Sequence, residues 1–319
     1  MSVSRPFHPP RFRAAAIFTA ALLPLLALAA CSPSTSTTPS TIESLAPEGQ
    51  GVEQTIDVDV DGTARSFELS VPPRTDDSPL PVIIALHQLG GSGGDFESFA
   101  GFSDRMASDG FLTIYPDGLA TSDGTTVWNA GNCCNEIGAE KTDDIGFLSA
   151  ILDQIPELGG DPSRVYLAGF SNGGMLSYRA SCELADRISG LAVVSGAYNV
   201  AECPDTSPVP IIIVHGLLDD FIPYEGGISP DSVSEGLDPV VHPPVEETVQ
   251  TWVERNQCTG TPAESTVGHA TLLEYTDCAD GASVSFYSVD GLYHEWPTDP
   301  EVLDVSEIIV DRFITGSAG

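Results

Sequence analysis

The feature of this sequence that most restricts its fold is a regular alternation of short apolar runs with amphipathic segments. The apolar runs are nearly continuous, which is typical of strands that are covered on both faces. Segments with helical spacing separate most of these runs, and strands that alternate with helices favour a parallel, doubly wound α/β sheet. The apolar runs occupy residues 81–87, 111–116, 164–169, 190–196, 210–216 and 283–289, and the clearest helical segments occupy 143–155, 245–256 and 300–314.

The sheet is expected to begin with an antiparallel hairpin. Residues 55–71 alternate apolar and polar side chains around Asp61-Gly62, a pair that suits a tight turn. Residues 51–319 make up roughly 270 positions, a normal size for one large α/β domain. We therefore predict that residues 51–319 form a single large α/β domain, with its functional groups at the carboxyl ends of the parallel strands.

The first thirty residues resemble an export signal. Three arginines precede an apolar run of about 17 residues that contains Pro24 and ends in small residues, which favours a signal peptide over a membrane span. The run ends in Leu-Ala-Ala-Cys, similar to a bacterial lipobox, in which Cys31 becomes the lipidated first residue. Ordinary secretion, with Cys31 lost or unmodified, is the alternative. We predict a signal peptide over 1–30 and a Ser/Thr/Pro-rich tether over 31–50, which places the domain outside the cytoplasm.

The chain is strongly acidic, with 12 Lys and Arg residues against 46 Asp and Glu residues. Removal of residues 1–30 deletes three arginines and no acids, so the net charge changes from −34 to −37. Such a surface repels nucleic acid and anionic lipid, which leaves the acyl chains on Cys31 as the expected membrane contact. Lys141 is the single lysine. This composition fits either adaptation to salt or an ordinary acidic exported protein.

The cysteines indicate disulfides rather than metal ligands. Six of them follow Cys31, and an even number in an exported chain favours disulfide bonds. No C-x-x-C or histidine-rich spacing indicates a metal site, and we expect no cofactor. The adjacent Cys133 and Cys134 form either a strained vicinal disulfide or two free thiols. The six are Cys133, Cys134, Cys182, Cys203, Cys258 and Cys278.

The predicted topology suggests two of the pairings. Cys182 ends the helix that follows residue 171, and Cys203 lies shortly before a later strand, so both belong at the edge opposite the functional groups. Cys258 and Cys278 flank a short excursion between a helix and a strand. We therefore expect the disulfides Cys182–Cys203 and Cys258–Cys278.

Residues 167–176 read Leu-Ala-Gly-Phe-Ser-Asn-Gly-Gly-Met-Leu and place Ser171 between glycines two positions to either side. The G-x-S-x-G pattern is weak by itself, because a chain with 31 glycines also forms simple glycine-rich turns. Its context is more specific, since an apolar run precedes it and a helical pattern over 172–187 follows, as in a nucleophile elbow. In such an elbow a side chain at Gly169 or Gly173 would collide with neighbouring backbone.

A nucleophilic serine needs a base and an acid, and the α/β-hydrolase fold supplies them in the chain order serine, acid, histidine. Asp219 lies five residues after the run that ends at Val214, and His294 lies five residues after the run that ends at Val289. Both positions fall on loops where the fold requires these groups. Asp220 is an alternative to Asp219 for the role of the acid. Each of the two could instead be a solvated acid of the loop.

The other histidines fit the role of base less well. His8 is removed with the signal, while His87 and His215 belong to strand ends before the required position. His242 lies in a proline-rich loop, and His269 lies in the segment bounded by cysteines. This leaves His294 as the candidate base.

These residue types support acyl transfer. His294 would take the proton of Ser171 during attack on an ester carbonyl and pass it to the leaving alcohol, while the acid holds the imidazole tautomer. The developing oxyanion needs fixed hydrogen-bond donors. We expect the backbone N–H of Asn172 to be one donor and that of Leu89 or Gln88 to be the second.

Eight segments, taken in order, resemble the secreted polyhydroxybutyrate-depolymerase-like esterases, a group of α/β-hydrolases that includes feruloyl and related carbohydrate esterases. The likeness covers about residues 56–314 and implies a carboxylic ester hydrolase that uses the serine, aspartate and histidine chosen above. In these relatives the first loop usually reads His-Gly, whereas this chain has Gln88 after His87. The segments are ALHQLGGSGGDF, IYPDG, WNAGNCC, DDIGFL, GFSNGGML, HGLLDDFIPY, VERNQC and YHEWP.

The expected substrate is a soluble ester, such as a feruloylated or acetylated saccharide or a short hydroxyalkanoate oligomer. Trp128 and Trp296 are candidates for an aromatic wall beside the acyl group, with simple burial as the alternative. A bond between Cys133 and Cys134 would stiffen that wall. Two other classes stay open, namely a lipid-anchored binding protein that has lost its chemistry and a serine peptidase of the same fold. The oligomeric state also stays open.

Overall fold

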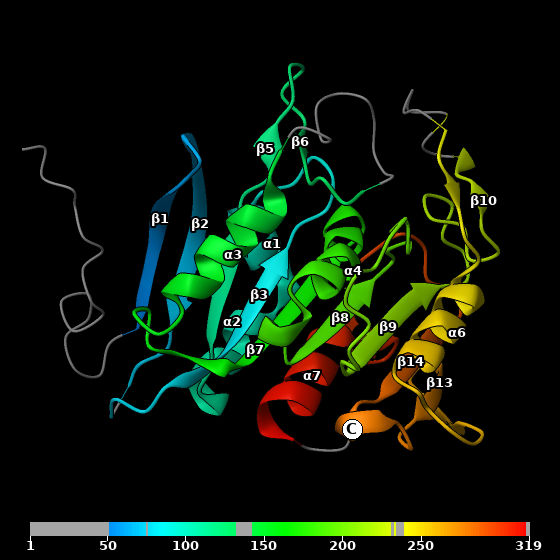
Figure 1. The fold of residues 1–319 in the computed structure, drawn as a ribbon. Helices are drawn as coiled ribbons and strands as arrows, with labels where there is room; N and C mark the ends of the chain where they lie inside the picture. Colours follow the sequence, from blue (N-terminus) through cyan, green and yellow to red (C-terminus); the bar gives the residue numbers. More distant parts are fainter. Residues whose placement is uncertain (1–50, 75, 132–141, 231–232, 234–238, 317–319) are drawn as a thin grey trace, which may run out of the picture. The chain divides into compact units, whose positions relative to one another are not determined.

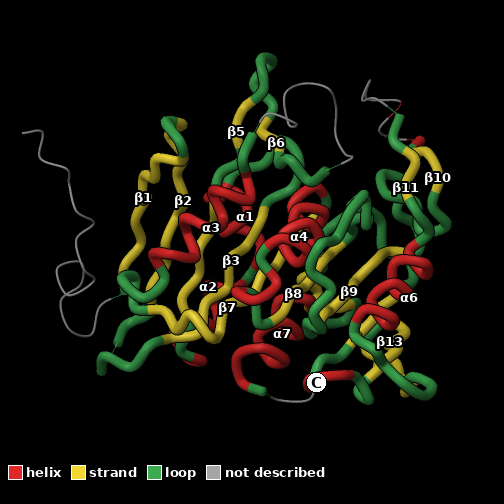
Figure 2. Tube along the Cα trace, in the orientation of Figure 1, coloured by secondary structure: helices red, strands yellow, loops and turns green. Residues whose placement is uncertain are grey.

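The computed structural model of the protein describes residues 51–74, 76–131, 142–230, 233 and 239–316. The described chain is built on a ten-stranded sheet with the order β1-β2-β4-β3-β7-β8-β9-β14-β13-β12 (Figures 1 and 2). From β4 to β14 the strands pair in parallel, and two antiparallel strands flank them at each edge. This arrangement is the mostly parallel α/β-hydrolase sheet that the sequence predicts.

Each apolar run of the sequence forms one of the parallel strands. Apart from residues 162–164, these strands have no exposed side chains, as expected for strands covered on both faces. Their bounds are β3 (Leu80–Leu86), β4 (Leu112–Pro116), β7 (Gly160–Phe170), β8 (Gly190–Val194), β9 (Ile211–Gly216) and β14 (Val284–Val289).

Antiparallel hairpins close the two edges of the sheet. The predicted first hairpin is present as β1 (Val52–Val60) and β2 (Thr63–Val71), with Gly62 in the turn at φ 84°. The segment between Cys258 and Cys278, expected as a simple excursion, forms a second hairpin of β12 (Ala263–Val267) and β13 (Ala270–Tyr275). This hairpin adds to the sheet because β13 pairs with β14.

Helices cover both faces of the sheet (Figure 1). One face carries α3, α4 and α6, and the other carries α1, α2 and α7. The helices are α1 (Gly93–Ala100), α2 (Phe102–Asp109), α3 (Asp144–Gln154), α4 (Asn172–Glu183), α6 (Val245–Arg255) and α7 (Val305–Val310).

The period of two along a strand divides the core between these faces. On β3, Val82, Ile84 and Leu86 pack into the layer of α3, α4 and α6, while Ile83 and Ala85 pack into the opposite layer. All five are fully buried. Burying a side chain of this kind stabilises the fold by about 1.5–3 kcal/mol, so both layers contribute to holding the central strands.

The last predicted helix is shorter than expected. Its sequence pattern suggests residues 300–314, but a small hairpin of β15 (Thr298–Asp299) and β16 (Leu303–Asp304) takes up the first part. The helix α7 begins only after Asp304, whose side chain accepts a hydrogen bond from the N–H of Glu307. An N-cap aspartate satisfies one of the free donors of the first turn, which explains why the helix begins there.

Among the described residues, disulfides join Cys182 to Cys203 and Cys258 to Cys278, the two pairs expected from the predicted topology. Such bonds fit an oxidising location outside the cytoplasm. Cys133 and Cys134 lie outside the described residues, as do Cys31, the predicted signal peptide and the tether.

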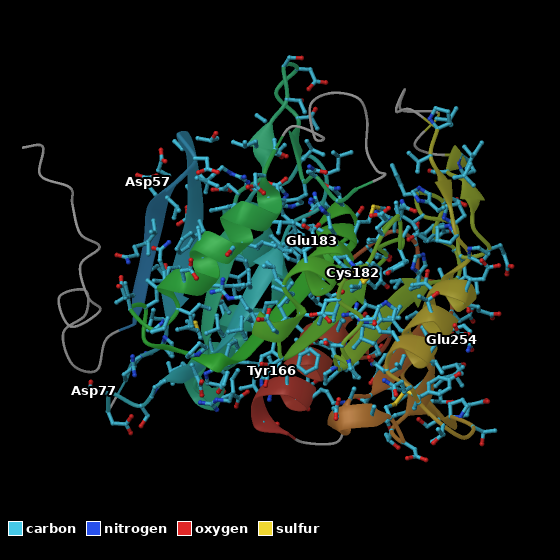
Figure 3. The ribbon with its side chains drawn as sticks, viewed as in Figure 1. Asp57, Asp77, Tyr166, Cys182, Glu183 and Glu254 are labelled. Atoms are coloured by element: carbon cyan, nitrogen blue, oxygen red, sulfur yellow. A yellow bond between two sulfur atoms is a disulfide. The ribbon has the colours of Figure 1, made fainter. Side chains whose placement is uncertain are left out.

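The acidic side chains lie on the surface of several elements (Figure 3). Figure 3 labels exposed acids on β1, on the segment before β3, at the end of α4 and on α6. Within the described part of the chain, none of the helices combines the length and apolar character needed to cross a bilayer. The described residues also include no group of three or more His, Cys, Asp or Glu side chains suited to hold a metal ion.

Candidate active site

Ser171 occupies the sharp turn between β7 and α4. Its backbone has φ 53° and ψ −118°, a conformation that is strained for a residue with a side chain. The turn is tight enough that a Cβ atom on Gly169 would overlap the backbone of Gly173, and one on Gly173 would overlap the carbonyl oxygen of Leu86. The two glycines of the G-x-S-x-G pattern are therefore required by space, as the sequence predicts.

His294 and Asp219 lie in line behind this serine. The Nε2 atom of His294 is 2.9 Å from Oγ of Ser171, and its Nδ1 atom is 2.8 Å from Oδ2 of Asp219. Because a carboxylate only accepts hydrogen bonds, the proton of the neutral imidazole lies on Nδ1, and Nε2 accepts from the serine hydroxyl. The neighbouring Asp220 is exposed, so Asp219 is the acid that faces His294.

The carboxylate of Asp219 is buried but well supplied with donors. Burial alone would raise its pKa, yet the hydrogen bonds from His294 and from the backbone N–H of Ile222 keep the pKa below its ordinary value. Its Oδ1 atom also accepts the backbone N–H groups of Phe221 at 3.0 Å and Ile222 at 2.8 Å. The acid is thus held ionised and in one orientation.

A buried histidine, His215, supports the loop that carries Asp219. The Nε2 atom of His215 donates to the carbonyl oxygen of Ile222 at 2.7 Å and lies 3.4 Å from Oδ2 of Asp219. Burial lowers the pKa of His215, which keeps its imidazole neutral. Its Nδ1 atom has no hydrogen-bond partner among the described residues. From the sequence alone, His215 is expected at a strand end, before the position that the fold requires of the base, and has no predicted part in the site.

Aromatic rings enclose the imidazole of His294. The rings of Phe170 and Phe221 each have their centroids 5.2 Å from it, and Phe170 packs in turn against Trp296. Trp296 is itself buried, and its Nε1–H donates to Oγ of Ser306 at 3.0 Å. Trp296 therefore supports the residues around His294 from within the core.

Trp128 is also a core residue. Its side chain is fully buried, and its Nε1–H donates to the carbonyl oxygen of His87 at 2.9 Å. Its backbone is bound by the side chain of Asn172, which accepts from the N–H of Trp128 at 2.8 Å and donates to its carbonyl at 3.2 Å. Trp128 and Trp296 are therefore both buried core residues, as the alternative interpretation of the sequence had it. Neither indole is available as an exposed wall for a substrate.

The loop after β3 carries the expected second oxyanion donors, Gln88 and Leu89. It is fixed by His87, whose Nδ1–H donates to the carbonyl of Gln88 at 2.7 Å and whose Nε2 accepts from the N–H of Gly118 at 2.9 Å. Burial lowers the pKa of His87, in agreement with a neutral ring. Gln88 and Leu89 are partly buried, and Asn172 begins α4 beside Ser171. The assignment of Asn172 and of Leu89 or Gln88 as oxyanion donors stays a prediction.

A buried ion pair holds the loop that contains Trp128. Arg65 of β2 donates to Oδ1 of Asp144 at 2.8 Å, and both side chains are almost wholly inaccessible. The other oxygen of Asp144 accepts the N–H of Asn129 at 2.7 Å. The Arg65 guanidinium lies 4.1 Å from the ring centroid of Phe147. The pair has no local signal in the sequence, since its members lie far apart along the chain.

Comparisons with known proteins agree with this architecture. The sequence model of the Phospholipase/Carboxylesterase family matches residues 132–234. Feruloyl esterase B of Piromyces equi is 31% identical over 228 residues, which cover 69% of this chain and 40% of that protein. Feruloyl esterase C of Emericella nidulans is 27% identical over 240 residues, which cover 71% of this chain and 75% of that protein.

A solved structure, the acetyl xylan esterase from Aspergillus awamori, aligns with a TM-score of 0.57 at 14% identity and covers 82% of this chain and 99% of that one. At that identity the likeness shows the fold. The alignment with the Piromyces protein spans less than half of that relative's length. By its sheet topology the chain has the α/β-hydrolase fold, and its sequence is similar to those of feruloyl esterases.

Proposed function

We propose that this protein is a serine esterase that hydrolyses carboxylic esters through an acyl-enzyme intermediate. The observation that carries the proposal is the 2.9 Å contact between Nε2 of His294 and Oγ of Ser171, with the Asp219 carboxylate bound to the other imidazole nitrogen. A serine that has a base within hydrogen-bond distance, itself oriented by a third group, is the arrangement of an activated nucleophile.

In the first half of the reaction, Oγ of Ser171 attacks the ester carbonyl while Nε2 of His294 takes the hydroxyl proton. The carbonyl oxygen becomes an oxyanion, for which we propose the backbone N–H of Asn172 and that of Leu89 or Gln88 as donors. The imidazolium then gives its proton to the leaving alcohol as the carbon–oxygen bond breaks.

In the second half, water replaces the alcohol. It loses its proton to His294 as it attacks the acyl carbonyl, and collapse of the second tetrahedral intermediate returns the proton to Oγ of Ser171 and releases the acid. Asp219 keeps its charge throughout and stabilises the imidazolium, in agreement with its lowered pKa.

The proposed substrates are esters of saccharides with ferulic or acetic acid, or short hydroxyalkanoate oligomers. The names of the sequence relatives support the first class, since two of them are feruloyl esterases. We further propose export by the signal peptide over 1–30 and lipidation of Cys31. Mass spectrometry of the mature N-terminus tests lipidation, and an unmodified Cys31 would show ordinary secretion instead.

The test of the esterase proposal combines covalent labelling with a substrate panel. A fluorophosphonate should label the wild-type protein on Ser171, and Ser171→Ala should remove both the label and the hydrolysis of p-nitrophenyl acyl esters and methyl ferulate. Ser98→Ala, an exposed serine in α1, is the matched control and should keep both.

Two results would contradict the proposal. A wild-type protein that takes no label would be a binding protein on a hydrolase scaffold. A labelled protein that cleaves peptide anilides and leaves the esters intact would be a serine peptidase.

A further inference from the structure

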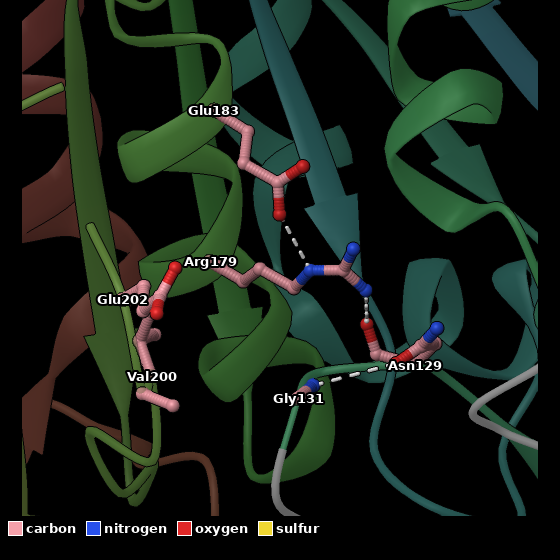
Figure 4. Close-up of a pocket in the computed structure, with 7 residues that line it drawn as sticks. Asn129, Gly131, Arg179, Glu183, Val200 and Glu202 are labelled. Atoms are coloured by element: carbon pink, nitrogen blue, oxygen red, sulfur yellow. Dashed lines mark hydrogen bonds and ion pairs between the residues drawn. The ribbon is translucent and has the colours of Figure 1, made fainter. Parts of the chain in front are cut away.

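A cavity of about 330 Å³ lies beside α4, apart from the Ser171–His294 contact. Three segments line it, namely the loop after β6 (Thr126–Val127) with Asn129, the helix α4 with Arg179 and Glu183, and the loop after β8 with Val200 and Glu202 (Figure 4). Its volume is at the lower end of the range for small-ligand sites, about 300–1,000 Å³.

The positively charged side chain of this cavity, Arg179, is held in a fixed position. The Nε–H of Arg179 donates to Glu183 at 2.7 Å, and one of its Nη1–H groups donates to the carbonyl oxygen of Asn129 at 2.7 Å (Figure 4). These two bonds orient the planar guanidinium without using all of its five N–H donors. Arg179 is therefore a pre-organised donor at the cavity.

The charges around the cavity restrict the kind of ligand. One guanidinium stands beside the carboxylates of Glu183 and Glu202, so the lining carries a net charge of about −1. An anion would meet two carboxylates on a strongly acidic protein, so an anionic ligand is disfavoured. A neutral ligand with many hydroxyl groups suits both sets of groups, because each hydroxyl can donate to a carboxylate and accept from the guanidinium.

The cavity and the turn at Ser171 are built on the same two segments, namely α4 and the loop that contains Trp128. Arg179 lies eight residues after Ser171 on the same helix, which corresponds to about 12 Å along the helix axis. Asn129 directly follows Trp128, whose backbone is bound by the Asn172 side chain. A short oligosaccharide can span this distance from a serine-bound ester.

We propose that this cavity is a subsite for the neutral saccharide part of the ester. The proposal rests on the esterase function proposed above and selects saccharide esters over hydroxyalkanoate oligomers within it. The apolar surface of Val200 would contact the C–H groups of a sugar ring, and Arg179, Glu183 and Glu202 would bind its hydroxyls.

The experiment first measures binding in the absence of catalysis. Unesterified xylo-oligosaccharides are titrated into the wild-type protein and into Ala201→Trp, which fills the cavity from an exposed position. We expect binding in the millimolar range or tighter by the wild type and a loss of at least about tenfold in Ala201→Trp. Glu264→Gln, an exposed acid on β12 outside the cavity, is the control and should bind as the wild type does.

A kinetic measurement then connects the cavity to the reaction. In Ala201→Trp and in Glu202→Gln, the ratio of kcat/KM on an acetylated xylo-oligosaccharide to kcat/KM on p-nitrophenyl acetate should fall at least about fivefold, mainly through KM. An unchanged ratio, or sugar binding that is absent or unaffected by Ala201→Trp, would overturn the subsite. A wild type that hydrolyses no ester would instead overturn the proposed function, and the sugar titration would still decide whether the cavity binds saccharide.

Discussion

The imidazole of His215 lies against the carboxylate of Asp219, with Nε2 of the histidine 3.4 Å from Oδ2 of the acid. The same Nε2–H donates to the carbonyl oxygen of Ile222, which is three residues further along the loop. Ile222 in turn donates its N–H to Asp219. His215 thus closes the loop on which the proposed catalytic acid is held, and we infer that it is a positioning residue.

Substitution of His215 should reduce the rate without contact with the substrate. In His215→Leu the donor to Ile222 is lost, and we expect kcat to fall about tenfold to a hundredfold with little change in KM, because small misplacements of catalytic groups carry costs of this size. His215→Gln keeps an N–H near the position of Nε2 and should recover part of the rate. The measurement is kcat on p-nitrophenyl acetate together with the rate of fluorophosphonate labelling.

A purely structural role for His215 makes a different prediction. The variants would then lose thermal stability while the labelling rate of the folded protein stayed at the wild-type value. That result would contradict a positioning role.

Asp219 and Asp220 form a matched pair for testing the acid. Asp219→Asn replaces the acceptor of the His294 Nδ1–H by a group that also donates, which favours the wrong imidazole tautomer, and we expect kcat to fall by about 10³–10⁴. Asp220→Asn alters an exposed carboxylate one residue away and should change kcat less than about twofold. Steady-state kinetics on one soluble ester compares the two. Equal effects of the two substitutions would show that His294 has a different acid partner.

The sequence was sufficient to predict the sheet and the spacing of the proposed trio. Buried parallel strands leave continuous apolar runs, and Ser171, Asp219 and His294 each follow such a run at a loop position that the fold determines. The supporting residues could not be found in this way. The contacts of Arg65 with Asp144 and of Phe170 with His294 depend on packing between segments far apart in the chain, and no local pattern indicates which segments will meet.

The hairpin of β12 and β13 shows the same limit. Most of β12 is exposed, and β13 is fully buried only at Ala270 and Leu272, so neither strand has the apolar run that marks the central strands. Trp128 and Trp296 illustrate a further limit of prediction from sequence. An aromatic side chain near a proposed catalytic residue fits either a core position or a substrate-binding wall, and only its burial in the structure distinguishes the two.

The glycines of the elbow allow a test of backbone geometry. In Gly173→Ala the new methyl group would overlap the carbonyl oxygens of Leu86 and His87, which lie at the end of the central strand β3 and directly after it and cannot move away freely. We expect the free energy of unfolding to fall by about 1–3 kcal/mol, as for other overpacked sites. Gly94→Ala is the control, because Gly94 in α1 has open space around its Cα and alanine favours a helix by up to about 1 kcal/mol. Urea denaturation measures both, and an unaltered midpoint for Gly173→Ala would contradict the close approach.

The buried histidines should make the fold sensitive to mild acid. Burial lowers the pKa of His87, His215 and His242, in the case of His242 from 6.5 to about 4. In the unfolded chain these imidazoles bind protons near pH 6.5, whereas the folded chain holds them neutral to lower pH. The unfolded state therefore binds more protons, and the free energy of unfolding falls as the pH decreases from about 6.5 towards 4.

His242 offers a way to assign part of this loss. Its Nδ1 atom lies 3.1 Å from the side-chain nitrogen of Asn199, so His242→Gln can keep a polar partner while it removes the titrating group. Since one pKa unit corresponds to about 1.4 kcal/mol, we expect the variant to lose less stability than the wild type between pH 7 and pH 4.5, by on the order of 2 kcal/mol. Urea denaturation at several pH values measures this difference. Parallel stability curves for the two proteins would mean that His242 titrates alike in the folded and unfolded states, and the acid sensitivity would then have to come from His87 and His215 alone.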